Sequence, residues 1–308
     1  MNVKKYILRI IKIALSLYVL YWIIIFLTLV YNSFTEPHEY LASDYRIFKD
    51  TPAWDLAKAV RDADTAEITY LVQEKKIPID FQDSIYGKSL LSLAVYHNNL
   101  KSVKKILELG ADPNLYEDTI NQQGTNPVID ACFFNEEISI EILKLLLDYG
   151  GDPNSVTKGI TKNGEYSFPF RQTALEAASR NGNIAKIKLL LNYGADVNFT
   201  PDRDYDTDPL LEALETENMR AALCLLENGA KFDKEYINPF DKEKETILFI
   251  LRKIDLQLNS DEYKYKLKIV NFLKKKGLDY YNEPIPDFMI KRIKRLHPND
   301  WQEYMQKY

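Results

Sequence analysis

The chain has 308 residues, and 46% of them are hydrophobic, which is enough to bury a sizeable core and excludes a disordered chain. Its 40 basic and 45 acidic residues give a formal charge of -5. Because binding to phosphate backbones needs clustered positive charge, we do not expect nucleic acid as a partner.

The first predicted element is a transmembrane helix at residues 13–31, where the uncharged run IALSLYVLYWIIIFLTLVY occurs. At about 1.5 Å of rise per residue, this run matches a hydrocarbon core of about 30 Å. Basic residues precede the run and acidic residues follow it, namely Lys4, Lys5, Arg9 and Lys12, then Glu36, Glu39 and Asp44. The positive-inside rule therefore predicts that residues 1–12 are cytosolic and that the remaining chain is extracytoplasmic, on the periplasmic side if the protein is bacterial.

A secretory signal peptide would show the same order of charges. Such a peptide has a shorter apolar stretch that ends at small residues, whereas this run continues into Leu29, Val30 and Tyr31 with no small-x-small cleavage site. We therefore interpret residues 13–31 as a retained signal anchor, in preference to a cleaved peptide or a buried core helix. Residues 32–49 are then expected to be a juxtamembrane linker.

Further along the chain, one segment occurs four times, at residues 104–114, 145–154, 189–198 and 223–231. In each copy, leucine or isoleucine at helical spacing precedes a glycine, which is the residue that accepts the left-handed conformation at the C-terminus of a helix. The four glycines are Gly110, Gly150, Gly194 and Gly229. A shorter helix is predicted before each long one, as in residues 172–183, where alanines allow close packing.

These helix pairs resemble the ankyrin repeat. The residues that carry the resemblance are best seen in one unit, with Thr173, Leu175, Ala178, Gly182, Leu190, Leu191 and Gly194-Ala-Asp-Val-Asn198. The resemblance implies an all-α fold: a solenoid of about six helix pairs over residues 50–283, of which the first and last are degenerate, preceded by a single transmembrane helix. Glycine spacings of 40, 44, 35 and 48 residues mostly exceed the usual period of about 33, so extended fingers are expected between repeats.

The chain also departs from the family pattern. The histidine that usually lies in the first helix of a repeat is replaced by Ser92, Ile129, Glu176 and Leu211, so its bonds between loops must be absent or rebuilt. Cys132 and Cys224 fall two repeats apart and are expected to be buried thiols. Residues 284–308 are expected to form a helical C-terminal cap, and its basic run at residues 291–295 is explained either as an outer helix face or, less simply, by contact with anionic lipid headgroups.

Little in the sequence indicates catalysis. His38, His97 and His297 share no ligand-like spacing, and no phosphate-binding loop or nucleophile motif occurs, so we expect no enzyme activity, no cofactor and no small-molecule substrate. Four alternating carboxylates resemble a calcium loop, although its twelfth position is Ala213 where a glutamate is needed. An acidic finger tip is the preferred interpretation of Asp202, Asp204, Asp206 and Asp208, and a calcium site is the alternative.

Two surfaces are candidates for binding a protein partner. In the insertion at residues 155–171, Tyr166, Phe168 and Phe170 alternate and would share one face of an extended finger beside Arg171, a composition typical of binding hot spots. Packing of these rings on a neighbouring finger is an equal alternative. By analogy with the family, the ends of the first helices line a concave groove, and the residues there are Arg61, Tyr96, Phe133, Arg180 and Glu215.

We therefore expect a membrane-anchored ankyrin-repeat protein that binds another protein, of unknown identity, through its groove and fingers without catalysis. Since bacterial proteins with this layout include envelope factors and immunity proteins, neutralisation of a toxin at the envelope is one alternative. A cytosol-facing scaffold under the membrane is another, and a calcium-regulated module is a third.

Overall fold

The computed structural model describes residues 40–117, 124–134, 136–162, 165–168, 171–202, 207–238 and 242–308. Residues 42–308 form one compact unit. Across these described ranges, no helix combines the length and the apolar composition that a membrane crossing requires. The expected anchor at residues 13–31 lies outside the described residues.

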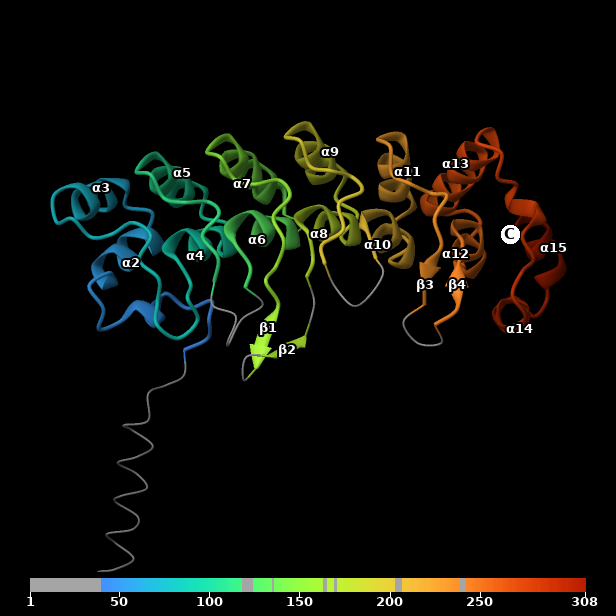
Figure 1. Ribbon diagram of the computed structural model, residues 1–308, viewed down its shortest axis with the longest axis horizontal. Coiled ribbons are helices and arrows are strands. Elements are labelled where there is room, and N and C mark those ends of the chain that lie inside the picture. The colour runs from blue at the N-terminus through green and yellow to red at the C-terminus, as the bar shows by residue number, and fades with distance from the viewer. Residues whose placement is uncertain are drawn as a thin grey trace, which may run out of the picture. The chain divides into compact units, whose positions relative to one another are not determined.

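Two layers of helices make up this unit (Figure 1). The first layer consists of α2 (Trp54–Arg61), α4 (Leu90–Tyr96), α6 (Pro127–Phe133), α8 (Ala174–Arg180), α10 (Pro209–Glu215) and α12 (Ile247–Lys253). The second consists of α3 (Thr65–Gln73), α5 (Leu100–Glu108), α7 (Glu137–Asp148), α9 (Ile184–Asn192), α11 (Met219–Glu227) and α13 (Asp261–Lys275). Each helix packs on the next one in its own layer. The six successive pairs confirm the expected helical solenoid of ankyrin type.

Side-chain caps set where the first-layer helices begin. In α4, α6, α8, α10 and α12 the capping side chain accepts a hydrogen bond from the backbone N–H three residues later, and the caps are Ser89, Asn126, Thr173, Asp208 and Thr246. Thr173 and Glu176 cap each other's backbone N–H groups in a capping box. The glutamate that replaces the family's histidine therefore fixes the start of α8.

The second-layer helices end as the sequence predicts. Gly110, Gly150, Gly194 and Gly229 adopt φ values of 94°, 88°, 91° and 91°, in the left-handed region that a residue with a Cβ resists.

The predicted buried thiols are also confirmed, since Cys132 and Cys224 are both free and buried.

Asparagine side chains connect the turns that follow these glycines. The Asn198 Oδ1 accepts from the Lys231 backbone N–H at 2.8 Å, and its Nδ2 donates to the Gly229 carbonyl oxygen at 3.1 Å. Asn114 and Asn154 make the same pair of bonds to the repeat that follows each of them. These asparagine side chains form a ladder of amides that connects successive loops.

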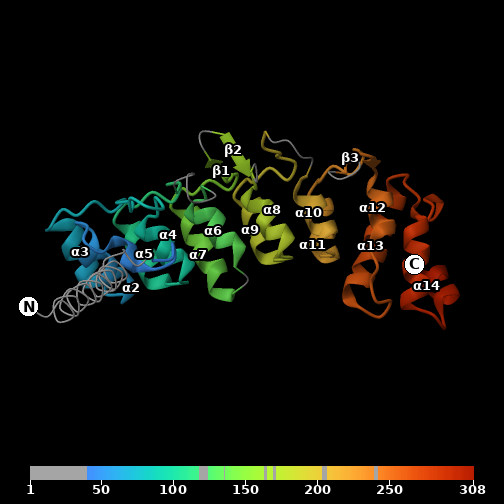
Figure 2. The ribbon, with the colours of Figure 1, turned by 90° about the horizontal axis from the view of Figure 1, so that it is seen from below.

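The fingers contain two short antiparallel hairpins that the all-α expectation did not include. The strand β1 (Ile160–Lys162) pairs with β2 (Glu165–Phe168), and β3 (Tyr236–Ile237) pairs with β4 (Lys244–Glu245). Both hairpins project from the first layer on the same side of the solenoid (Figures 1 and 2). Fingers of this length have room to pair their own backbones, which satisfies N–H and C=O groups that a helix would otherwise pair.

The N-terminal end of the solenoid starts earlier than residue 50. A short 3-10 helix, η1 (Tyr45–Phe48), packs on α2, and Tyr45, Ile47 and Phe48 are buried. These residues were expected in the juxtamembrane linker. They are instead part of the core, because their apolar side chains cover the face of α2 that no preceding repeat covers.

The C-terminal end carries a small core of its own. After η2 (Tyr280–Asn282), the helices α14 (Asp287–Leu296) and α15 (Trp301–Lys307) pack together around Met289, Ile293, Tyr304 and Tyr308. The guanidinium of Arg252 on α12 donates to the carbonyl oxygens of Tyr280, Glu283 and Tyr308. This single buried side chain fastens residues 280–308 to the last repeat.

Candidate functional site

The ends of the first-layer helices form the candidate site, and Tyr96 is its most exposed aromatic residue. Tyr96 is the last residue of α4, and it is 41% exposed. The ring meets Phe134 edge to face, with centroids 5.4 Å apart and planes at 86°. Because Phe134 follows α6, this contact joins two successive repeats.

The aromatic contacts continue toward the N-terminus. The rings of Tyr96 and His97 meet edge to face at 5.3 Å, and His97 stacks on Tyr45 of η1 with centroids 5.1 Å apart. The Nε2 of His97 also lies 2.6 Å from the Ser43 carbonyl oxygen. We call the four rings of Tyr45, His97, Tyr96 and Phe134 the aromatic path. It crosses η1, α4 and the end of α6, and each ring is held by the next.

Charged side chains occupy the equivalent positions in the later repeats. Arg180 at the end of α8 donates from Nε to the Oε2 of Glu212 on α10 at 2.8 Å. The exposed Glu215 ends α10, and the pKa of its carboxyl is raised by partial desolvation and by the nearby Glu212. Lys253 on α12 pairs with Glu245 of β4. The site thus changes from aromatic to ionic along the solenoid.

Arg61 and Phe133 occupy the remaining positions predicted for the groove. Arg61 ends α2 and pairs with its neighbour Asp62 at 2.7 Å, so its charge is partly neutralised. Phe133 is half-buried, and its carbonyl oxygen accepts a hydrogen bond from the Asn181 side chain of the next repeat at 3.0 Å. Phe133 is therefore less accessible than Tyr96, and its backbone ties α6 to α8.

The predicted aromatic finger is a hairpin whose backbone the structure describes in part. Tyr166 and Phe168 belong to β2, and Phe170 lies outside the described residues. The backbone register of the hairpin shifts between Ile160 and Thr161. Arg171 leaves the hairpin and donates to the Asp202 carbonyl oxygen at 3.1 Å, which connects this finger with the next. The binding role of these residues stays a prediction.

The four alternating aspartates are divided by the structure. Asp208 caps α10 by accepting from the Leu211 N–H at 2.7 Å, and its carboxylate pairs with Lys234 at 2.8 Å. Asp202 is exposed, whereas Asp204 and Asp206 lie outside the described residues. Asp208 therefore has a structural role of its own. Within the described ranges, no group of three or more metal-ligating side chains is gathered.

A buried ionic cluster lies under the finger that follows α5. The Lys88 ammonium pairs with the Glu117 carboxylate, and both side chains are almost fully buried. Burial, and next the charge of Asp130, raise the pKa of Glu117 to about 7. Burial also raises the pKa of Asp130. One lysine facing two carboxyl groups favours a protonated carboxyl, because a second buried negative charge would be uncompensated.

A surface hollow of about 270 Å³ lies between α2 and α3. It is lined by Ala59, one lysine and four carboxylates, namely Lys58, Asp55, Asp62, Asp64 and Glu67. Ligand pockets are usually larger and mostly apolar. A small-molecule site is not indicated there.

Sequence reasoning missed several members of the site. Phe134 and His97 each follow a predicted residue directly, so a wider window around each helix end would have found them. Tyr45 was assigned to the linker. Glu212 meets Arg180 only through packing of α8 on α10, whereas Glu245 and Lys253 pair within one repeat, between β4 and α12.

Comparisons with known proteins agree with the fold. A family model for ankyrin repeats, in three copies, matches residues 56–157 and 129–236, which together are more than half of the chain. A protein of Acanthamoeba polyphaga mimivirus, described as an ankyrin repeat protein, is 31% identical over 120 residues, which cover 38% of this chain and 66% of that protein. A fowlpox virus protein with the same description is 26% identical over 219 residues, which cover 68% of this chain and 57% of that protein. This chain thus spans only part of both relatives.

A search of solved structures found a partial match. It is a crystal structure of an ankyrin repeat protein, with 22% sequence identity and a TM-score of 0.48, and the match covers 70% of this chain and 96% of the other.

Proposed function

Because the chain belongs to the ankyrin-repeat family, we propose that it is a non-catalytic protein that binds a partner protein across the ends of its first-layer helices and its fingers, and that residues 13–31 anchor it in a membrane. Stacked repeats offer an extended surface rather than a closed pocket, which suits a macromolecular ligand.

The observation that carries this proposal is the aromatic path. Its central ring, Tyr96, is 41% exposed, while Phe134 and His97 contact it on both sides. A large ring held rigidly at the surface loses little conformational entropy on binding, which is why tyrosine is common among hot-spot residues. The ion pairs at Arg180 and Lys253, further along the same row of helix ends, supply fixed charges for specificity.

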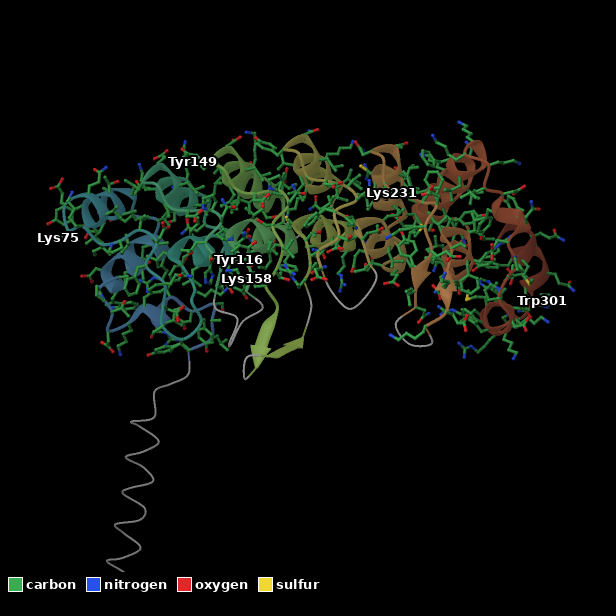
Figure 3. The ribbon with its side chains drawn as sticks, viewed as in Figure 1. Lys75, Tyr116, Tyr149, Lys158, Lys231 and Trp301 are labelled. Atoms are coloured by element: carbon green, nitrogen blue, oxygen red, sulfur yellow. The ribbon has the colours of Figure 1, made fainter. Side chains whose placement is uncertain are left out.

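The test is a capture experiment with the full-length protein as bait on cell extract. Tyr96→Ala should weaken capture of the bound protein by about 30-fold or more, the usual effect of removing a hot-spot ring. Tyr149→Ala is the matched control, because Tyr149 is 44% exposed but follows α7 in the second layer of helices, where Figure 3 labels it. Equal capture by the two variants would exclude the aromatic path as the binding surface.

A third variant separates the groove from the fingers. Replacing Tyr166, Phe168 and Phe170 together by alanine tests the hairpin. Melting temperatures for each variant show whether a loss of capture reflects misfolding. If only the hairpin variant loses its partner, the finger is the binding surface and the aromatic path is structural.

The proposed anchor is tested separately from binding. The full chain should remain in the membrane fraction after carbonate extraction, whereas a variant lacking residues 1–41 should be released. Lys75 is exposed at the end of α3, and both native cysteines are buried, so Lys75→Cys provides a selective label. Labelling of intact cells with an impermeant maleimide supports the extracytoplasmic orientation, and labelling only after lysis supports the cytosol-facing scaffold.

A further inference from the structure

The outer face of α14 carries a stripe of basic and apolar residues. Phe288, Lys291, Arg292, Arg295 and Leu296 follow the spacing i, i+3, i+4, i+7 and i+8, which places them on one side of a helix. Phe288 is 53% exposed and Leu296 is 50% exposed. The adjoining side of the helix, with Met289 and Ile293, is buried in the C-terminal core. We call the first five residues the α14 stripe.

Capping the solenoid does not account for the α14 stripe. A capping helix needs one apolar face toward the last repeat, which Met289 and Ile293 supply, and a polar outer face. The stripe instead exposes two large apolar side chains, Phe288 and Leu296, at either end of its three cations. Of its three cations, Arg292 pairs with Asp255 at 3.2 Å, and no ion pair in the part of the chain that the structure describes involves Lys291 or Arg295.

The surrounding surface is also basic. Residues 251–308 contain 13 basic and 8 acidic residues, whereas residues 51–250 contain 21 basic and 33 acidic residues. The positive charge of the repeat domain is therefore concentrated at its C-terminal end. Lys294 lies beside the stripe with its ammonium 4.5 Å from the centroid of the Trp301 ring, which adds a half-buried aromatic residue to the same region.

We propose that the α14 stripe binds an anionic phospholipid surface. Cations beside exposed aromatic and aliphatic side chains are the combination that binds a bilayer interface, where headgroups attract the charges and the apolar side chains enter the acyl boundary. An acidic protein segment would match the charges but would leave Phe288 and Leu296 without an apolar environment. Nucleic acid would also match the charges, but it offers no acyl boundary for these two side chains.

The location of α14 agrees with such a contact. In Figure 1, α14 lies on the lower side of the solenoid, which is also where η1 begins the domain. This proposal rests on the anchor proposed above, because residues 32–41 can span at most about 36 Å and would hold the start of the domain near the bilayer. The α14 stripe would then be a second contact that limits how the solenoid tilts above the membrane.

The test uses residues 42–308, which contain every buried hydrophobic residue of the described chain and therefore the whole of its core. Without the anchor, binding to vesicles reports on the repeat domain alone, so failure of this proposal and failure of the anchor are distinguishable. Co-sedimentation should show binding to vesicles containing 30% phosphatidylglycerol, weaker binding in 1 M salt, and little binding to vesicles of phosphatidylcholine alone.

Variants then locate the contact. Lys291→Glu with Arg295→Glu should lower the partition coefficient by at least about 30-fold, since each cation near an anionic surface contributes about fivefold. Phe288→Ala should lower the partition coefficient as well, because the variant lacks the ring that enters the acyl boundary. Lys274→Glu with Lys275→Glu is the matched control, which makes the same charge change at exposed positions on α13.

The proposal is overturned if vesicles of the two compositions bind equally, if the α13 control loses as much binding as the α14 variant, or if Phe288→Ala has no effect. Circular dichroism melting of each variant identifies any that are misfolded. If the Lys291→Glu, Arg295→Glu variant is misfolded, Lys291→Gln with Arg295→Gln removes the charges without reversing them and provides the same comparison.

Discussion

The Lys186 ammonium on α9 donates a hydrogen bond to the carbonyl oxygen of Ala131 on α6, at 2.6 Å. It also donates to the Phe134 carbonyl oxygen, and Asn181 donates to those of Cys132 and Phe133. In α2, α4, α8 and α10 a backbone N–H at the C-cap closes the helix. At the end of α6 the chain turns into an extended conformation, and two side chains from the next repeat supply the donors.

We predict that Lys186→Met lowers the free energy of unfolding by about 1–3 kcal/mol, because it leaves buried carbonyl oxygens without donors while keeping the apolar stem. Lys188→Met is the control, since Lys188 is exposed on the same helix. Urea denaturation of both variants measures the difference. Equal stability of the two would mean that the cost of burying the ammonium offsets its hydrogen bonds.

The amide ladder gives a second prediction. Asn198→Ala removes the bonds to Lys231 and Gly229, which join the fourth and fifth repeats, and should cost about 1–3 kcal/mol. Asn192→Ala, at an exposed position on α9, should change stability by less than about 0.5 kcal/mol. Thermal melting distinguishes them. Because repeat proteins are stabilised by neighbouring interfaces, broadening of the transition for Asn198→Ala would indicate that the solenoid separates at this point.

The buried ionic cluster of Lys88, Glu117 and Asp130 should make the stability of the fold depend on pH. The pKa of Glu117 is raised by burial and by Asp130 to about 7 in the folded state, above its usual 4.5. A carboxyl with a raised folded pKa contributes stability that is complete below about pH 4.5 and is lost as the pH rises through about 7. The wild-type melting temperature should therefore decline between pH 5 and pH 8, and Glu117→Gln should remove part of that decline.

Glu108→Gln is the control for the pH experiment. Lys105 lowers the pKa of the exposed Glu108, so its contribution has the opposite sign and is lost on acidification. Its effect should be small because water screens the pair. If Glu117→Gln follows the wild-type profile from pH 5 to pH 8, the cluster does not titrate in that range.

Alanine substitutions at two glycines should separate the loss of stability caused by backbone strain from the loss caused by a steric clash. Gly182 and Gly194 have φ values of 65° and 91°, so alanine is strained at both. A Cβ at Gly194 would meet nothing within 4 Å, whereas at Gly182 it would lie 2.5 Å from the Asn218 Oδ1. The Asn218 Nδ2 donates a hydrogen bond of 2.7 Å to the Arg180 carbonyl oxygen. Gly194→Ala should cost about 1 kcal/mol, and Gly182→Ala should cost about 1–2 kcal/mol more. Equal losses in chemical denaturation would show that Asn218 moves aside without cost.

The repeats themselves could be predicted because their causes are local. Leucines at helical spacing, capping residues such as Thr173 and left-handed glycines such as Gly194 act within a few residues of the chain, and their recurrence identifies the architecture. The ends of the first-layer helices were located by analogy with the family's repeat, and Tyr96 and Arg180 were found in this way.

The contacts that these helix-end residues make depended on how successive repeats pack on one another. The aromatic path joins Tyr45 to Phe134 across 89 positions of sequence, and Lys186 reaches α6 from the following repeat. Both relationships follow from how helices stack, which the pattern of one repeat does not contain. The sequence by itself determined a solenoid with glycine-capped helix pairs, and it predicts an anchor at residues 13–31. Only the tertiary structure decided which rings and charges meet on its surface, because those contacts are made between repeats.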